Sequence, residues 1–192
     1  MKKVVGIMLA CVLLVFSLSG CQNSGESRTF ETLSVTFDGG KTLSMEMNQE
    51  AVRKVIGEEP TETKEEMGQL SDDWDLDYAL SVKYKTEEPY KVTWISFPMA
   101  GVDFETSLGI AKGDSVASIK EKLGDLCTKS DSDESTSYSY AFRYADGKYE
   151  IVDPNKTIGE LMGDSKDVGF YGATFVCEND KVTRCYFSDH LA

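Results

Sequence analysis

Residues 109–124 read Gly-Ile-Ala-Lys-Gly-Asp-Ser-Val-Ala-Ser-Ile-Lys-Glu-Lys-Leu-Gly, and this stretch indicates the fold. Ser115 is a good helix N-cap, and Gly124 stands where a helix commonly ends in a left-handed residue. The apolar residues between them are spaced at i, i+3 and i+7, which places them on one helix face: Val116, Ile119 and Leu123. We therefore predict a short amphipathic helix with one buried face.

The same pattern occurs 67 residues earlier, and no gap is needed between Val35 and Gly57. The shift pairs Val35 with Val102, Phe37 with Phe104, Asp38 with Glu105, Leu43 with Ile110, Asn48 with Ser115, Val52 with Ile119, Arg53 with Lys120, Ile56 with Leu123 and Gly57 with Gly124. A shift of 60 then pairs Tyr78, Val82, Lys83 and Tyr84 with Tyr138, Phe142, Arg143 and Tyr144. These matches predict two tandem repeats, residues 33–98 and 99–192. Chance similarity between two strand–helix segments is the alternative.

Alternation of large and small side chains predicts the sheet of each repeat. Residues 78–84 and 138–144 alternate with period two, which is typical of half-buried antiparallel strands. We expect residues 90–97 and 148–153 to pair with them, and a hairpin turning at Asn179-Asp180 to close the fold. A short helix is expected at residues 157–162. The predicted fold class is α+β, with a short helical segment packed on an antiparallel sheet in each repeat.

The N-terminus predicts export and lipid attachment. Lys2 and Lys3 precede an apolar run, residues 4–16, which is shorter than the roughly 20 residues of a membrane span and fits a signal peptide. Leu18-Ser19-Gly20-Cys21 resembles the bacterial lipobox, which implies that Cys21 carries diacylglycerol and palmitate-type chains. An ordinary secretory signal with a chance cysteine is the alternative. Residues 1–20 would then be removed, and residues 21–32 would form a lipidated N-terminus and flexible tether.

Charge and composition exclude several classes of function. The chain has 192 residues and a net charge of −13, and removal of Lys2 and Lys3 with the signal peptide takes this to −15. Nucleic acid is a poor partner for such a protein because phosphates are bound by Lys and Arg. The single histidine, His190, argues against a histidine-based metal site or triad. We predict no enzyme activity, no cofactor and no metal, and a position on the extracytoplasmic face of the cell membrane.

The order of strand, helix and antiparallel strands resembles the SmpA/OmlA-type small lipoprotein domain, and in tandem it resembles the β-lactamase inhibitory protein family. The similarity covers about residues 33–189. It implies non-catalytic binding of another protein by the concave face of the sheet and its loops. The first repeat has no cysteine, whereas the inhibitors have disulfides, and no inhibitory motif matches.

An acid-rich segment, residues 58–77, contains nine carboxylates and only Lys64 as a cation. It reads as a solvated loop, with a weak cation site or a docking loop for a basic partner as alternatives. Residues 73–77 resemble the start of a calcium loop, but Tyr78 and Tyr84 stand where that loop needs glycine and glutamate. The equivalent acidic loop of the second repeat contains Asp131, Asp133 and Glu134.

Three cysteines follow Cys21 in the chain. The turn at Asn179-Asp180 would place Cys177 opposite Val182 and Cys185 opposite Thr174, so that the two thiols point to opposite faces and cannot bond. We expect them to be small buried apolar residues, while pairing of Cys127 with either stays open. A Cys185–His190 nucleophile lacks an orienting third group.

Residues 90–97 carry large apolar side chains on both faces of a strand. Strict alternation puts Tyr90, Val92 and Trp94 on one face and Thr93, Ile95 and Phe97 on the other. Helices cover only one face, so either a loop or the other repeat covers the second face, or it is an exposed aromatic platform. The predicted partner-binding residues are Tyr90, Trp94, Asp73, Trp74 and Asp75.

The sequence therefore predicts a membrane-anchored lipoprotein that binds an envelope or extracellular protein. A basic partner would be steered by the acidic rim and held by the aromatic residues. The alternative is a lipoprotein that binds or senses a small ligand or a cation.

Overall fold

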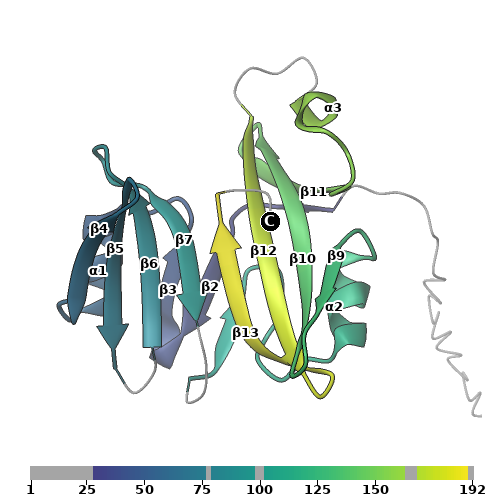
Figure 1. Cartoon of the computed structure of the whole chain (residues 1–192), viewed down its shortest axis with the longest axis horizontal. Helices are drawn as coiled ribbons and strands as arrows, with labels where there is room; N and C mark the ends of the chain where they lie inside the picture. The colour runs from purple at the N-terminus through teal and green to yellow at the C-terminus, as the bar shows by residue number, and fades with distance from the viewer. Residues whose placement is uncertain (1–27, 77–78, 98–101, 163–167, 190–192) are drawn as a thin grey trace, which may run out of the picture.

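The computed structural model describes residues 28–76, 79–97, 102–162 and 168–189 (Figure 1). These residues form an α+β protein, mostly antiparallel sheet with three short α-helices. The elements are β1 (Thr29–Phe30), β2 (Ser34–Phe37), β3 (Lys41–Ser44), α1 (Gln49–Ile56), β4 (Glu62–Glu66), β5 (Gln69–Asp75), β6 (Ala79–Lys85), β7 (Val92–Phe97), β8 (Phe104–Thr106), α2 (Val116–Leu123), β9 (Thr128–Asp131), β10 (Thr136–Ala145), β11 (Lys148–Val152), α3 (Ile158–Met162), β12 (Gly169–Glu178) and β13 (Lys181–Ser188). The predicted signal peptide, Cys21, Tyr78 and His190 lie outside the described residues.

One ten-stranded antiparallel sheet runs through the whole molecule. Its order is β1-β11-β10-β12-β13-β7-β6-β5-β4, and β9 also pairs with β10. The strands from the two parts of the chain meet at β13 and β7, where Cys185 lies opposite Phe97 and Ser188 opposite Trp94. A separate small sheet has the order β3-β2-β8, with Phe37 opposite Phe104. Residues far apart in the sequence are therefore joined in both sheets.

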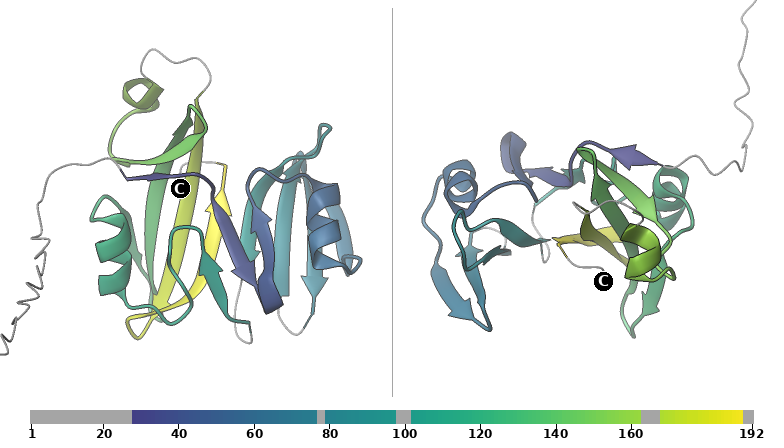
Figure 2. Two further views of the ribbon diagram at one scale, coloured as in Figure 1. Left: turned by 180° about the vertical axis from the view of Figure 1, so that it is seen from behind. Right: turned by 90° about the horizontal axis from the view of Figure 1, so that it is seen from above.

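The core lies between one face of the large sheet and a layer made of α1, α2 and the small sheet (Figure 2). Both predicted N-caps are confirmed, since Asn48 Oδ1 accepts from Ala51 N at 2.9 Å and Ser115 Oγ from Ser118 N at 3.2 Å. The predicted buried faces are also present: Val52 and Ile56 in α1, and Ile119 and Leu123 in α2.

The two helix ends differ, which corrects one expectation. Gly57 is left-handed as predicted, with φ 77° and ψ 4°. Gly124 also has a positive φ of 87°, but its ψ of −169° is extended. The chain therefore leaves α2 in a different direction, towards β9.

Helix α3 lies on the opposite face of the large sheet from α1 and α2. Its Leu161 packs with Ala141 and Val152 in a small second apolar cluster, which Phe170 borders. Thr157 and Glu160 cap its start reciprocally, because the Thr157 amide donates to Glu160 Oε2 at 2.8 Å and the Glu160 amide donates to Thr157 Oγ1 at 3.4 Å. The short helix predicted at residues 157–162 is confirmed.

The acid-rich segment is a hairpin and not the predicted loop. β4 and β5 pair from Glu62 opposite Asp73 to Glu66 opposite Gln69. Met67 and Gly68 make the turn, with φ values of 52° and 76°. Charged residues tolerate this position because β4 is an edge strand whose side chains mostly face solvent.

A bulge corrects the predicted faces of two cysteines. The hairpin turn at Asn179-Asp180 and the pairing of Cys177 with Val182 are confirmed. A register shift between Val176 and Cys177 then places Cys185 opposite Phe175, so both thiols point into the core. Both are buried and free, as expected, and Cys127 is also free. Burial raises the pKa of the Cys177 thiol to about 11.

Candidate partner-binding face

The face of the large sheet that carries no α1, α2 or small sheet is here called the open face. Cross-strand pairing brings its residues into rows that run across the sheet. One row is Lys64, Ser71, Lys83, Trp94, Ser188, Gly172, Ala141 and Val152. The next row is Glu62, Asp73, Ser81, Ser96, Tyr186, Thr174, Ser139 and Thr128. Helix α3 covers the Ala141 and Val152 end of the first row.

Trp94 and Tyr186 form an aromatic pair in the middle of this face. Their ring centroids are 5.7 Å apart and both side chains are half-buried. The pair spans the β7–β13 junction, where the two halves of the sheet meet. Most of its neighbours on the face are serine or threonine, which leave the two rings as the largest groups that a partner would meet. Aromatic residues among small hydroxyl side chains are a composition typical of binding surfaces.

A bulge in β7 explains why Trp94 faces outward. Lys83 pairs with Trp94, but Tyr84 pairs with Val92, so Thr93 is an extra residue in β7. Val92 therefore faces the core together with Ile95 and Phe97. The predicted sharing of one face by Val92 and Trp94 is wrong, because strict alternation does not allow for the extra residue. Ile95 and Phe97 are core residues, and Trp94 is on the side away from α1 and α2.

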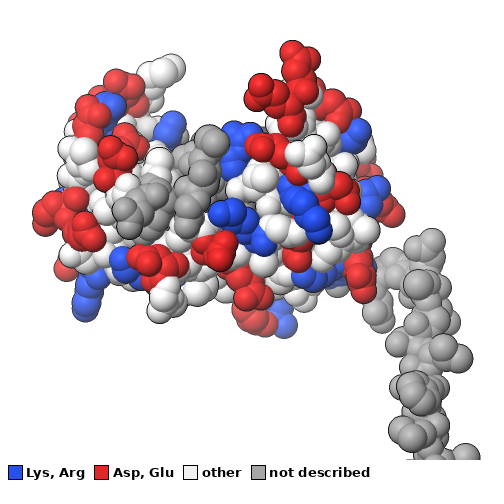
Figure 3. Space-filling view, turned by 90° about the horizontal axis from the view of Figure 1, so that it is seen from below, with Lys and Arg blue, Asp and Glu red and all other residues white. Residues whose placement is uncertain are grey.

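The charges on the open face are partly compensated. Lys64 Nζ lies 2.7 Å from Glu62 Oε2 and 4.0 Å from Asp73 Oδ2. Lys83, the cross-strand neighbour of Trp94, takes part in none of the ion pairs found among the described residues. Figure 3 shows the molecule from below, hollowed between two lobes, with acidic side chains on both lobes and basic ones towards the middle.

The structure separates the predicted binding residues. Trp74 is only 2% exposed, and its Nε1 donates to Glu58 O at 3.1 Å, so it is a core residue and not a surface anchor. Asp73 is half-buried on the open face, two strands away from Trp94, and Asp75 is exposed near the end of β5. Only Trp94 among the five lies at the centre of the face.

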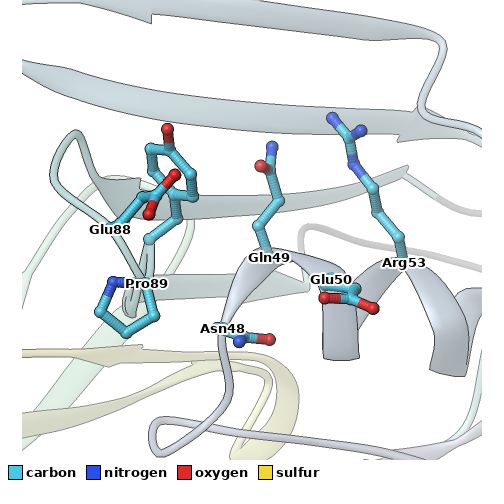
Figure 4. Close-up of a pocket in the computed structure, with 7 residues that line it drawn as sticks. Asn48, Gln49, Glu50, Arg53, Glu88 and Pro89 are labelled. Carbon is cyan, nitrogen blue, oxygen red and sulfur yellow. The ribbon is translucent and has the colours of Figure 1, made fainter.

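Tyr90 lies apart from the open face, in the loop between β6 and β7. It lines a hollow of about 710 Å³ beside the start of α1 (Figure 4). The other lining residues are Asn48, Gln49, Glu50, Arg53, Glu88 and Pro89. The Tyr90 carbonyl accepts from Gln49 N at 3.1 Å, which holds this loop against the helix.

The wall of this hollow is tied to a buried carboxylate. Arg53 Nε and Nη2 donate to the two oxygens of Asp72, each at 2.8 Å, and Asp72 has no exposed surface. Gln49 Nε2 also donates to Asp72 Oδ2 at 3.1 Å, and Thr63 Oγ1 donates to Oδ1 at 2.7 Å. Burial raises the pKa of Asp72, but hydrogen bonds from Arg53, Thr63 and Gln49 outweigh it, so the net shift is downward. This network fastens α1 to β4 and β5.

Sequence reasoning missed Tyr186, Lys83 and the Arg53–Asp72 pair. The pair had a signal, because Leu70, Asp72 and Trp74 are spaced by two, and a carboxylate on an apolar face needs a cationic partner. Tyr186 had no such signal, because its position beside Trp94 depends on the pairing of β13 with β7 across 92 residues of chain.

The described residues contain no group of three or more His, Cys, Asp or Glu side chains arranged to hold a metal ion. Among these residues no helix has the length and apolar character that crossing a bilayer requires.

No family model matches the chain, and comparisons with curated proteins and with solved structures likewise found no match.

Proposed function

We propose that the protein is a lipid-anchored, extracytoplasmic and non-catalytic binding protein that presents its open face to a partner protein. The observation that carries this proposal is the Trp94–Tyr186 pair near the middle of the open face, which α3 covers only at its Ala141 and Val152 end. Large aromatic side chains at the centre of an interface supply most of its binding energy. The proposed anchor rests on the lipobox-like residues 18–21.

The proposed partner is an envelope or extracellular protein that places a projecting element in the hollow between the two lobes (Figure 3). Small side chains around the rings, such as Ser81, Ser96 and Thr174, leave room for close approach to the sheet. The acidic lobes favour basic residues on the shoulders of that element, since complementary charge speeds encounter. Lys83 favours a carboxylate near its tip.

We also propose that the chain arose as a tandem repeat. In support, Asn48 and Ser115 cap equivalent helices, and Phe37 lies opposite Phe104, its match under the shift of 67. Counted outward from the β7–β13 junction, the strand orders are β7, β6, β5, β4 and β13, β12, β10, β11, and β9 pairs with the first residues of β10. In this comparison β6 corresponds to β12, so the shift of 60, which matched β6 with β10, does not fit the sheet order.

The test of function is capture of membrane and envelope proteins by immobilised mature protein, followed by affinity measurement with the purified partner. We expect Trp94→Ala to weaken that affinity at least about tenfold, as loss of a central aromatic anchor does. Met67→Ala is the matched control, because Met67 is fully exposed at the β4–β5 turn. Equal affinities for the parent and Trp94→Ala would remove the open face from the proposal.

A small-ligand function is the second candidate, and the hollow beside α1 is the observation that favours it. A concave site with an aromatic side chain and a few polar groups in its wall is the kind of site in which small molecules bind. Chemical modification of tyrosine distinguishes the two functions. A ligand in the hollow beside α1 would protect the Tyr90 ring, whereas a partner on the open face would protect Tyr186.

A further inference from the structure

The exposed apolar side chains of the protein are unevenly distributed. Four large ones stand out among the described residues: Met67, Leu126, Ile158 and Met162, with exposed fractions of 103%, 49%, 56% and 38%. Met67 is at the β4–β5 turn, at one end of the large sheet. The other three belong to segments at the opposite end.

Arg28 is the first described residue of the chain. It makes hydrogen bonds to the two segments that lead to those three residues. The Arg28 carbonyl accepts from Ile151 N at 3.1 Å, and Ile151 is in β11, which leads into α3 with Ile158 and Met162. Arg28 Nη1 donates to Glu121 O at 2.7 Å, and Glu121 is in α2, just before Leu126. Figures 1 and 2 show α2, α3 and the start of the body at the same end of the sheet.

We propose that this end of the sheet, with Leu126, Ile158 and Met162, rests on the phospholipid surface to which the protein is anchored. The inference depends on the proposed lipid anchor at Cys21. Seven residue steps separate Cys21 from Arg28, which span at most about 25 Å at roughly 3.5 Å per residue. Arg28 therefore stays within that distance of the lipid in every orientation of the body, and the two segments to which it is hydrogen-bonded lead to these three exposed apolar groups.

The contact is apolar and not electrostatic. Asp153 lies before α3 and Glu160 within it, and the mature chain has a charge of −15, so an anionic surface would repel this end. Apolar side chains at the headgroup boundary gain by leaving water, and the covalent anchor keeps them near the lipid. We expect the contact on phosphatidylcholine and weaker contact when anionic lipid is added at low salt.

The experiment places a tryptophan reporter at each end of the sheet in the full lipidated chain. Leu126→Trp and Ile158→Trp report on the proposed contact, and Met67→Trp is the matched control. Each variant is reconstituted in phosphatidylcholine vesicles that contain lipid with a quencher high on the acyl chain. The native residues Trp74 and Trp94 give the same background in all variants. We expect quenching of the added fluorescence at positions 126 and 158 to exceed that at position 67 at least about twofold.

Two failures are distinguishable. If the lipidated chain floats with the vesicles but positions 67, 126 and 158 are quenched equally, this orientation is wrong while the anchor stands. If the parent chain does not float with the vesicles, the anchor itself is wrong and the orientation fails with it. Stronger quenching at position 67 would mean that the body lies the other way round.

Discussion

Asp72 is the residue whose surroundings carry the clearest energetic consequence. It is fully buried and ionised, and its charge is compensated by a bidentate contact with Arg53. We expect Arg53→Ala to lower the free energy of unfolding by about 2–3 kcal/mol, because it leaves a buried carboxylate uncompensated. Urea denaturation measures this change. The control is Lys129→Ala, which breaks an exposed pair of 2.9 Å with Asp131 and is expected to cost less than about 1 kcal/mol. Equal losses in the two variants would contradict this account.

The same carboxylate predicts how stability depends on pH. The pKa of Asp72 is lower in the folded protein than in the unfolded chain, where it is about 3.9. Its contribution is therefore complete above the unfolded value and is lost as pH falls through the folded value. We expect the difference in unfolding free energy between the parent and Asp72→Asn to be constant near neutral pH and to shrink below about pH 4. A difference that persists unchanged to pH 2 would mean that charge is not what Asp72 contributes.

At the scale of elements, the two helix ends make different demands on glycine. Neither Gly57 nor Gly124 has an atom within 4 Å of an added Cβ, so substitution there costs backbone energy alone. Gly57 is left-handed, a conformation that asparagine tolerates, whereas Gly124 combines positive φ with extended ψ, which is almost confined to glycine. We expect Gly57→Asn to cost under about 1 kcal/mol and Gly124→Asn about 1–3 kcal/mol. Thermal unfolding of both variants tests the ranking, which equal Tm values would contradict.

The elements also show how far sequence reasoning reaches. Both helices, their caps and most strands follow from spacing, because the period of apolar residues reflects local geometry. The errors occur where one residue is added to a strand. Thr93 in β7 and Thr183 in β13 are each such an extra residue, and each changes which side chains face the core; alternation alone cannot reveal an inserted residue. The edge hairpin of β4 and β5 was not predicted for a different reason. Its many charged residues are equally typical of a solvated loop, so composition did not distinguish the two.

At the scale of the whole molecule, the two parts of the chain share both sheets, through β7–β13 and β2–β8. We therefore expect a single cooperative unfolding transition. Tryptophan fluorescence reports on the first part, which contains both Trp74 and Trp94, and reaction of a thiol reagent with Cys185, which is buried and free, reports on the second. The two urea midpoints should coincide, and Arg53→Ala should lower both equally. Exposure of Trp74 while Cys185 stays protected would show two independent units.

The two-residue strand β1 has a mechanical consequence. It joins β11 only through Thr29 and Phe30, with Arg28 bound at its start. If the protein is anchored as proposed, a pull on the N-terminus acts first on these few bonds and on the packing of Phe30 against Phe142. Detaching residues 28–32 would lengthen the free N-terminal tether by about 17 Å at roughly 3.4 Å per residue, while Leu33 remains packed in the core. Under the proposed anchoring, β1 would detach under load before the rest of the sheet, so the open face would keep its shape while its distance from the membrane changes.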